Sequence, residues 1–136
     1  QGASDLSARF VSEGTLLSLG LLTILHGKAR PRLVLIDDLD RGLHPKAQAA
    51  WVELLRKQLA NDPELQIVTT THSPYLLDSL VPEEVRCTSL RADGSAVCAP
   101  LTLHPEVDRW RHEMTPGELW SLFGEQWANP ECVHQG

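Results

Sequence analysis

Two adjacent aspartates, Asp37 and Asp38, end a run of four apolar residues in the stretch LVLIDDLDRGLHP, residues 33–45. A short apolar run is typical of a buried β-strand, and ligands of open α/β sheets bind at the carboxyl ends of the strands. Two carboxylates held there repel each other, and a divalent cation relieves that repulsion. Mg²⁺ takes one or two protein carboxylates together with waters and substrate phosphates. The doublet therefore indicates either a magnesium site, in which the second carboxylate polarises a water, or two solvated loop acids that cap the next helix.

A histidine, His72, ends the second β-rich run, LQIVTTTH, residues 65–72. Neighbouring parallel strands end at the same edge of a sheet, so we expect His72 near Asp37 and Asp38, where it could donate to a phosphate oxygen or position a water. A lone His-Ser-Pro is also a common helix cap. The adjacent Ser73 is not favoured as a nucleophile, because the chain has no G-x-S-x-G motif.

A hydroxyl residue and a glycine, Ser12 and Gly14, lie in VSEGT, residues 11–15, directly before a long apolar segment. Such residues at a helix N-terminus offer free N–H groups, a favourable dipole and close backbone approach to an anion. Taken alone, they fit a plain N-cap better.

The elements that must position these residues follow from apolar periodicity and from the prolines. The pattern predicts the following order: a buried helix at 15–26, a strand at 33–36 covered on both faces, a helix at 45–60, a strand within 65–72 and a short helix at 74–80. This order predicts an α/β fold with parallel strands. After Pro82 the pattern predicts a β-hairpin around Ala-Asp-Gly-Ser. An amphipathic segment at 105–127 then carries three tryptophans, which we expect to pack a C-terminal helix against the hairpin.

Composition limits the class of protein. The chain has 136 residues and a formal net charge of −6, which argues against a general nucleic-acid-binding surface. No apolar run approaches the roughly 18–20 residues of a membrane span. Three cysteines without a C-x-x-C pair favour a reduced, cytoplasmic protein, and the lack of a long apolar run means that no membrane partner is expected.

Taken in order, these motifs resemble the C-terminal half of an ABC-type ATPase domain, in the branch of RecF/SMC-like and OLD-like predicted ATPases of bacteria. VSEGT resembles the LSGGQ signature, LVLIDD the Walker B strand, DRGLHP the ENGLHP form of the D-loop and TTTHSPYLLD the H-loop. The resemblance implies the parallel-sheet core of a P-loop NTPase that lacks the P-loop strand, followed by a β-hairpin and a helix. Residues 1–14 would then be the signature region, 15–81 the core, and 82–136 the hairpin and C-terminal helix.

The resemblance also implies roles for single residues. Asp37 would help to hold Mg²⁺, Asp38 would orient the attacking water, and His72 would contact the γ-phosphate of ATP. Two copies would sandwich the nucleotide, so that Ser12 and Gly14 bind the partner's ATP in trans. Three residues would lie at the dimer seam: Gly42, Leu43 and His44. In this branch the attached module often acts on DNA, as in repair or phage defence, so a DNA or nuclease module is a further expected partner.

Two departures from the family pattern matter. Asp38 stands where the family usually has Glu, and mispositioning a reacting group by about 1 Å can cost roughly 100-fold in rate. We therefore expect slow hydrolysis, unless Asp40 or His72 compensates. The 136 residues also contain no G-x-x-x-x-G-K-[ST] motif, and the only Gly-Lys pair, Gly27-Lys28, ends a predicted helix. A P-loop-bearing segment or polypeptide is expected to supply it, and the chain alone is expected to bind ATP poorly and to be inactive.

Three hypotheses remain open on the sequence. The first is an ATPase half-domain that hydrolyses ATP once it is completed and dimerised. The second is a non-catalytic assembly or regulatory module, which both departures favour. The third is a small metal-dependent hydrolase that uses Asp37, Asp38 and His72, and its weakness is the lack of further convergent ligands.

Overall fold

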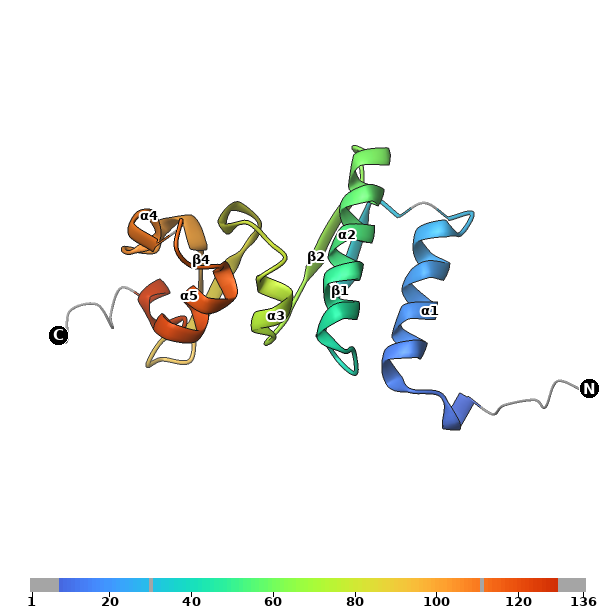
Figure 1. Cartoon of the computed structure of the whole chain (residues 1–136), viewed down its shortest axis with the longest axis horizontal. Coiled ribbons are helices and arrows are strands. Elements are labelled where there is room, and N and C mark those ends of the chain that lie inside the picture. Colours follow the sequence, from blue (N-terminus) through green and yellow to red (C-terminus); the bar gives the residue numbers. More distant parts are fainter. Residues whose placement is uncertain (1–7, 30, 111, 130–136) are drawn as a thin grey trace, which may run out of the picture. The chain divides into compact units, whose positions relative to one another are not determined.

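The computed structural model describes residues 8–29, 31–110 and 112–129, and the chain forms two compact units, Gln1–His72 and Ser73–Gly136. Among its described residues, the first unit contains a short 3₁₀ turn, two helices and two strands (Figure 1). Their bounds are η1 (Ala8–Phe10), α1 (Glu13–His26), β1 (Leu33–Ile36), α2 (Pro45–Asn61) and β2 (Gln66–Thr69). Each predicted element of this unit is therefore present, in the predicted order.

The helix α1 begins two residues before its predicted start because Ser12 caps it. The Oγ atom of Ser12 accepts a hydrogen bond from the backbone N–H of Thr15 at 3.2 Å. The expectation that α1 is buried is wrong for much of its surface. Leu21 is buried, but four apolar side chains are exposed in this structure: Leu16, Leu19, Leu22 and Ile24.

The helix α2 begins at Pro45, as predicted, with His44 as its N-cap. Its buried apolar face includes Trp51, Val52 and Leu55. The indole N–H of Trp51 donates to the Oγ atom of Ser18 at 3.1 Å, which joins α2 to α1. The predicted burial of Trp51 is confirmed.

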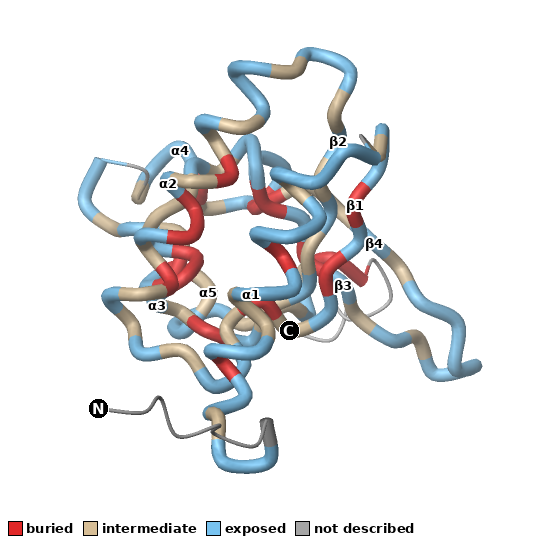
Figure 2. The backbone as a smooth tube through the Cα atoms, turned by 90° about the vertical axis from the view of Figure 1, so that its right-hand side faces the viewer, coloured by how far each residue is buried: buried red, intermediate tan, exposed pale blue. Residues whose placement is uncertain are grey.

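The strands β1 and β2 pair in parallel, as predicted, with Leu33 opposite Gln66 and Ile36 opposite Thr69. One face of β1 is buried, since Val34 and Ile36 are each 6% exposed (Figure 2). The expectation that β1 is covered on both faces is wrong, because Leu35 on the other face is 70% exposed. None of the described residues covers that face.

The second unit holds a β-hairpin among short helices. Its elements are α3 (Pro74–Leu77), η2 (Pro82–Glu84), β3 (Arg86–Leu90), β4 (Ala96–Pro100), η3 (Leu101–Leu103), α4 (Val107–Trp110), α5 (Pro116–Phe123) and η4 (Gln126–Ala128). The predicted hairpin is confirmed, with Arg86 opposite Pro100 in antiparallel pairing. At its turn, Gly94 has a φ of +82° and the carboxylate of Asp93 accepts the N–H of Ser95 at 2.8 Å.

The described part of the segment 105–127 contains α4 and α5, and Pro116, which lacks an N–H, fits the first turn of α5. Thr115 caps α5 together with Glu118, and its hydroxyl also donates to Asp78 just after α3 at 2.5 Å. The three tryptophans pack against one core, as predicted. The buried members of that core are Leu77, Val85, Cys87, Leu101, Val107, Leu119 and Ala128, with Trp110, Trp120 and Trp127 against them. Among the described residues, no helix combines the length and apolar character that crossing a membrane requires.

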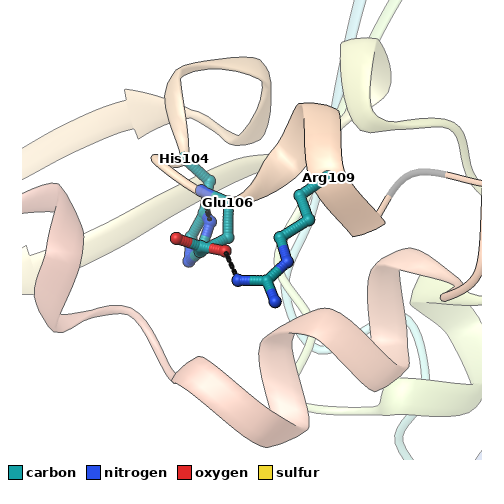
Figure 3. Close-up of polar contacts among 3 residues, drawn as sticks. All are labelled: His104, Glu106 and Arg109. Atoms are coloured by element: carbon teal, nitrogen blue, oxygen red, sulfur yellow. Dashed lines mark hydrogen bonds and ion pairs between the residues drawn. The ribbon is translucent and has the colours of Figure 1, made fainter.

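A buried histidine, His104, directly follows η3 in the second unit (Figure 3). Its Nδ1 atom accepts the backbone N–H of Glu106 at 3.0 Å, and its ring lies 5.1 Å from that of Phe123 and 4.9 Å from that of Trp127. Loss of hydration lowers the pKa of His104, while the negative charge of Glu106 opposes part of that shift. The Glu106 carboxylate also pairs with Arg109 at 3.3 Å. The folded protein therefore favours the neutral form of His104.

We predict that His104 makes the stability of the second unit depend on pH. The unfolded state binds a proton near the ordinary histidine pKa of about 6.5, and the folded state binds it only at lower pH. This contribution is complete above that value and is lost as the pH falls through the folded pKa. His104→Asn keeps an acceptor near the Nδ1 position but does not titrate, so the slope of unfolding free energy against pH should flatten between about pH 7 and 5. Urea unfolding followed by tryptophan fluorescence measures that slope. The exposed His112→Asn serves as control, and an unchanged slope in His104→Asn contradicts the assignment.

Candidate functional site at the ends of the parallel strands

The acidic doublet leaves the sheet at the same edge as the Thr-Thr-His segment. Asp37 and Asp38 directly follow β1, and the residues 70–72 directly follow β2. Because Ile36 and Thr69 lie opposite each other in the parallel pair, the two segments emerge side by side (Figure 1). The predicted adjacency of the two strands is confirmed.

One threonine joins the two segments. The hydroxyl of Thr70 donates to Oδ1 of Asp37 at 2.6 Å and accepts the backbone N–H of Asp38 at 2.9 Å. The Thr70 carbonyl accepts the N–H of Leu39 at 3.1 Å, and its own N–H donates to the carbonyl of Ile36 at 3.0 Å. Sequence reasoning missed Thr70. The signal that could have identified it was the run of three threonines before His72, in which Thr70 is the first residue after β2.

The backbone at Asp38 is unusual. Its φ is +49°, in the left-handed region that residues with a Cβ seldom adopt. The following residue, Leu39, is 0% exposed and anchors the turn in the core of the first unit. The next acid, Asp40, accepts a hydrogen bond from the hydroxyl of Thr71. The turn after β1 is therefore held to the end of β2 on both sides of Leu39.

The histidine His72 is exposed and lies three residues beyond the last residue of β2. Within the described part of the chain, its imidazole makes no hydrogen bond or ion pair. No described residue thus occupies the ring, so both nitrogens can meet a ligand.

The signature-like segment packs against the D-loop-like segment of the same chain. A Cβ atom added to Gly14 would lie 2.4 Å from the carbonyl oxygen of Gly42, and Gly42 itself has a φ of +67°. Beside this contact, the guanidinium of Arg41 pairs with the carboxylate of Glu13 at 2.9 Å. Ser12 is a helix N-cap, as the plainer interpretation of VSEGT holds. Within this chain the two glycines serve close packing.

The expected seam residues also have local roles. The Nδ1 atom of His44 accepts the N–H of Lys46 at 3.2 Å, which caps α2. The carbonyl of Leu43 accepts the side-chain amide of Gln48 at 3.1 Å. Gly42, Leu43 and His44 together form the turn that directly precedes α2.

The donor set at this edge fits a magnesium ion that keeps most of its waters. Asp37 is exposed, and among the described residues only its Oδ1 atom takes a hydrogen bond, so Oδ2 is available. The described residues contain no group of three or more His, Cys, Asp or Glu side chains that could hold a metal. One or two carboxylates together with several waters are a donor set that suits Mg²⁺.

A mixed α/β unit whose small parallel sheet ends in an acidic doublet is compatible with a fragment of a P-loop NTPase. The chain belongs to the family described as "AAA domain, putative AbiEii toxin, Type IV TA system", whose model matches residues 2–78. The matched part includes the whole β1–β2 edge, which agrees with the ATPase resemblance of the motifs.

Two curated proteins are similar to the chain. The Septu protein PtuA of Bacillus thuringiensis is 38% identical over 62 residues, which is 46% of this chain and 15% of that protein. The "Retron Vc95 probable ATPase" of Vibrio cholerae serotype O1 biovar El Tor is 33% identical over 84 residues, or 61% of this chain and 14% of that protein. The chain thus spans about a seventh of the length of either relative.

We predict that two glycines of α1 respond oppositely to alanine. Gly14→Ala forces a Cβ atom against the Gly42 carbonyl and should destabilise the first unit by about 1–3 kcal/mol. Gly20→Ala, for which the added Cβ atom meets nothing within 4 Å, should stabilise it by about 0.5–1 kcal/mol. Unfolding free energies from urea titration give both values. If the two variants shift stability equally, the close contact between Gly14 and Gly42 does not exist in solution.

Proposed function

We propose that this chain is the Walker B half of an ATP-hydrolysing domain of the AAA type. The observation that carries the proposal is the parallel pairing of β1 and β2, which brings Asp37 and Asp38 to the edge that His72 also leaves. The family match over residues 2–78 and the relative named a probable ATPase support it.

Each residue at the edge then has a distinct task. The exposed carboxylate of Asp37 helps to hold Mg²⁺ through water, and the ion, when bound, neutralises charge on the phosphates of ATP. Asp38 accepts a hydrogen bond from the attacking water and orients it toward the γ-phosphate. The free imidazole of His72 donates to a γ-phosphate oxygen. Positioning and charge neutralisation, rather than covalent chemistry, lower the barrier.

A P-loop-bearing segment completes this site in our proposal. The open face of the sheet presents three exposed apolar side chains, Leu33, Leu35 and Val68. A shallow hollow of about 290 Å³ lies beside these side chains and is lined by Leu35, Ile36, Asp37, Val68 and Thr70. Apolar surface of this kind gains stability when it is covered. We infer that the P-loop segment packs on this face and thereby delivers the phosphates to the two acids.

The complete domain works as a homodimer with two nucleotides at the interface. In that arrangement Ser12 and Gly14 bind the nucleotide of the other copy in trans. The turn of Gly42, Leu43 and His44 forms the seam that couples the two sites. The cycle of closing and opening drives an attached DNA or nuclease module in a process such as repair or phage defence.

The second candidate is a non-catalytic module that keeps the fold without turnover. Asp38 favours it, because its side chain is one methylene shorter than Glu and its backbone is held in a left-handed conformation.

We predict that Asp38→Asn in the full-length protein stops turnover but leaves ATP binding intact. The amide cannot accept a proton, so hydrolysis should fall by roughly 100-fold or more, and ATP should remain trapped in a closed dimer. Phosphate release and size-exclusion chromatography with bound ATP measure the two effects. Asp93→Asn, in the hairpin turn, is the matched control. Unchanged turnover in Asp38→Asn removes Asp38 as the residue that activates the attacking water, and a wild-type protein without turnover favours the non-catalytic module.

We predict that His72→Ala lowers turnover without lowering the melting temperature. The ring is exposed and unpaired among the described residues, so its removal costs the fold little. Loss of one donor to the transition state typically costs roughly 100-fold in rate. His112→Ala serves as the control at another exposed histidine. A fall in melting temperature with unchanged turnover would assign His72 to helix capping instead.

A further inference from the structure

The hydroxyl of Thr70 has a single proton and two lone pairs, and the structure uses the proton and one lone pair on the acidic doublet. The proton goes to Oδ1 of Asp37 at 2.6 Å, a length typical of a charge-assisted hydrogen bond. One lone pair accepts the N–H of Asp38 at 2.9 Å. One side chain therefore contacts both acids, at the side chain of the first and at the backbone of the second.

The bond to Asp37 determines which carboxylate oxygen is free. Because Oδ1 is held by Thr70, the carboxylate cannot turn without losing a strong hydrogen bond. Oδ2 takes no hydrogen bond from any described residue. The free oxygen is thus fixed in place before any ion or nucleotide binds.

The bond to Asp38 supports an uncommon backbone. A residue with a Cβ atom at φ +49° costs free energy relative to the usual conformations, and surrounding contacts must hold it there. The Thr70 hydroxyl and the Thr70 carbonyl bind the N–H groups of Asp38 and Leu39, on either side of the strained residue. Thr70 thereby sets the direction in which the chain leaves β1.

We propose that Thr70 is a positioning residue that orients the Asp37 carboxylate for Mg²⁺ and fixes the backbone of Asp38. This inference rests on the proposed ATPase function and extends it to a residue that touches neither the ion nor the nucleotide. Outer partners of metal-binding side chains commonly change metal affinity by 10- to 100-fold when removed.

The test uses the full-length protein and measures binding rather than turnover. Isothermal titration calorimetry with ATPγS, in Mg²⁺ and in EDTA, gives the factor by which Mg²⁺ tightens nucleotide binding. Thr70→Val keeps the branched shape but removes the hydroxyl, and it should reduce that factor by roughly 10-fold at an unchanged melting temperature. Thr70→Ser should retain it. Thr69→Val is the matched control, because among the described residues the Thr69 hydroxyl donates only to the carbonyl of Thr70, at 3.2 Å.

A second measurement reports how firmly the backbone is held at Asp38. In the absence of nucleotide, Thr70→Val should speed amide hydrogen exchange at Asp38, whereas Thr70→Ser and Thr69→Val should not. If Thr70 only stabilised the sheet as a whole, Thr70→Val would accelerate amide exchange throughout β1 and β2. If Thr70→Val does not fold, Thr70→Ala removes the same hydroxyl and is read in the same way.

The Asp37→Asn variant distinguishes a failure of the inference about Thr70 from a failure of the proposed function. If Asp37→Asn loses the Mg²⁺ effect and Thr70→Val keeps it, the inference about Thr70 is overturned and the proposed function stands. If Asp37→Asn itself keeps the full Mg²⁺ effect, the metal assignment fails and the role of Thr70 fails with it. Loss of the effect in both variants, with retention in Thr70→Ser, supports both.

Discussion

The junction between the ends of β1 and β2 is the constraint on which the first unit depends. Thr70 connects to the segment 36–39 through its amide, its carbonyl and both functions of its hydroxyl. A slip of one residue in the strand pairing would turn every side chain to the opposite face and would separate Thr70 from Asp37. The register of Ile36 against Thr69 is therefore a condition for any site at this edge.

The sheet that carries this junction is small and open on one side. Two strands rarely form a stable unit without further packing. Val34 and Ile36 are buried, whereas Leu33 and Leu35 on the other face are exposed. The same asymmetry appears on α1, where Leu21 is buried and Leu19 is 62% exposed. These surfaces are the physical reason to propose that a further segment of an ATPase domain completes the unit.

Close backbone packing gives a second constraint. The N-terminus of α1 touches the turn before α2 at Gly14 and Gly42, and the pair of Glu13 and Arg41 lies beside that contact. The ion pair is exposed and adds at most about 1 kcal/mol, so the steric contact is the stronger restriction. A segment that is proposed to bind nucleotide in trans is thus already fastened to the segment proposed to form the dimer seam.

The sequence by itself determined the helices and strands of the first unit, the hairpin of the second unit, and the family to which the chain belongs. Apolar runs identified β1 and β2, and proline at the first turn identified the starts of α2 and α3, because these signals act between near neighbours. The ends of the same apolar runs predicted that Asp37, Asp38 and His72 follow the strands.

Only the tertiary structure decided which groups meet. Thr70 and Asp37 are 33 residues apart, and no local pattern couples the hydroxyl of one to the carboxylate of the other. The exposure of Leu35, the contact between Gly14 and Gly42 and the burial of His104 depend in the same way on packing between distant segments. A hydrophobic period states that a side chain can be buried, but the neighbouring elements determine whether it is.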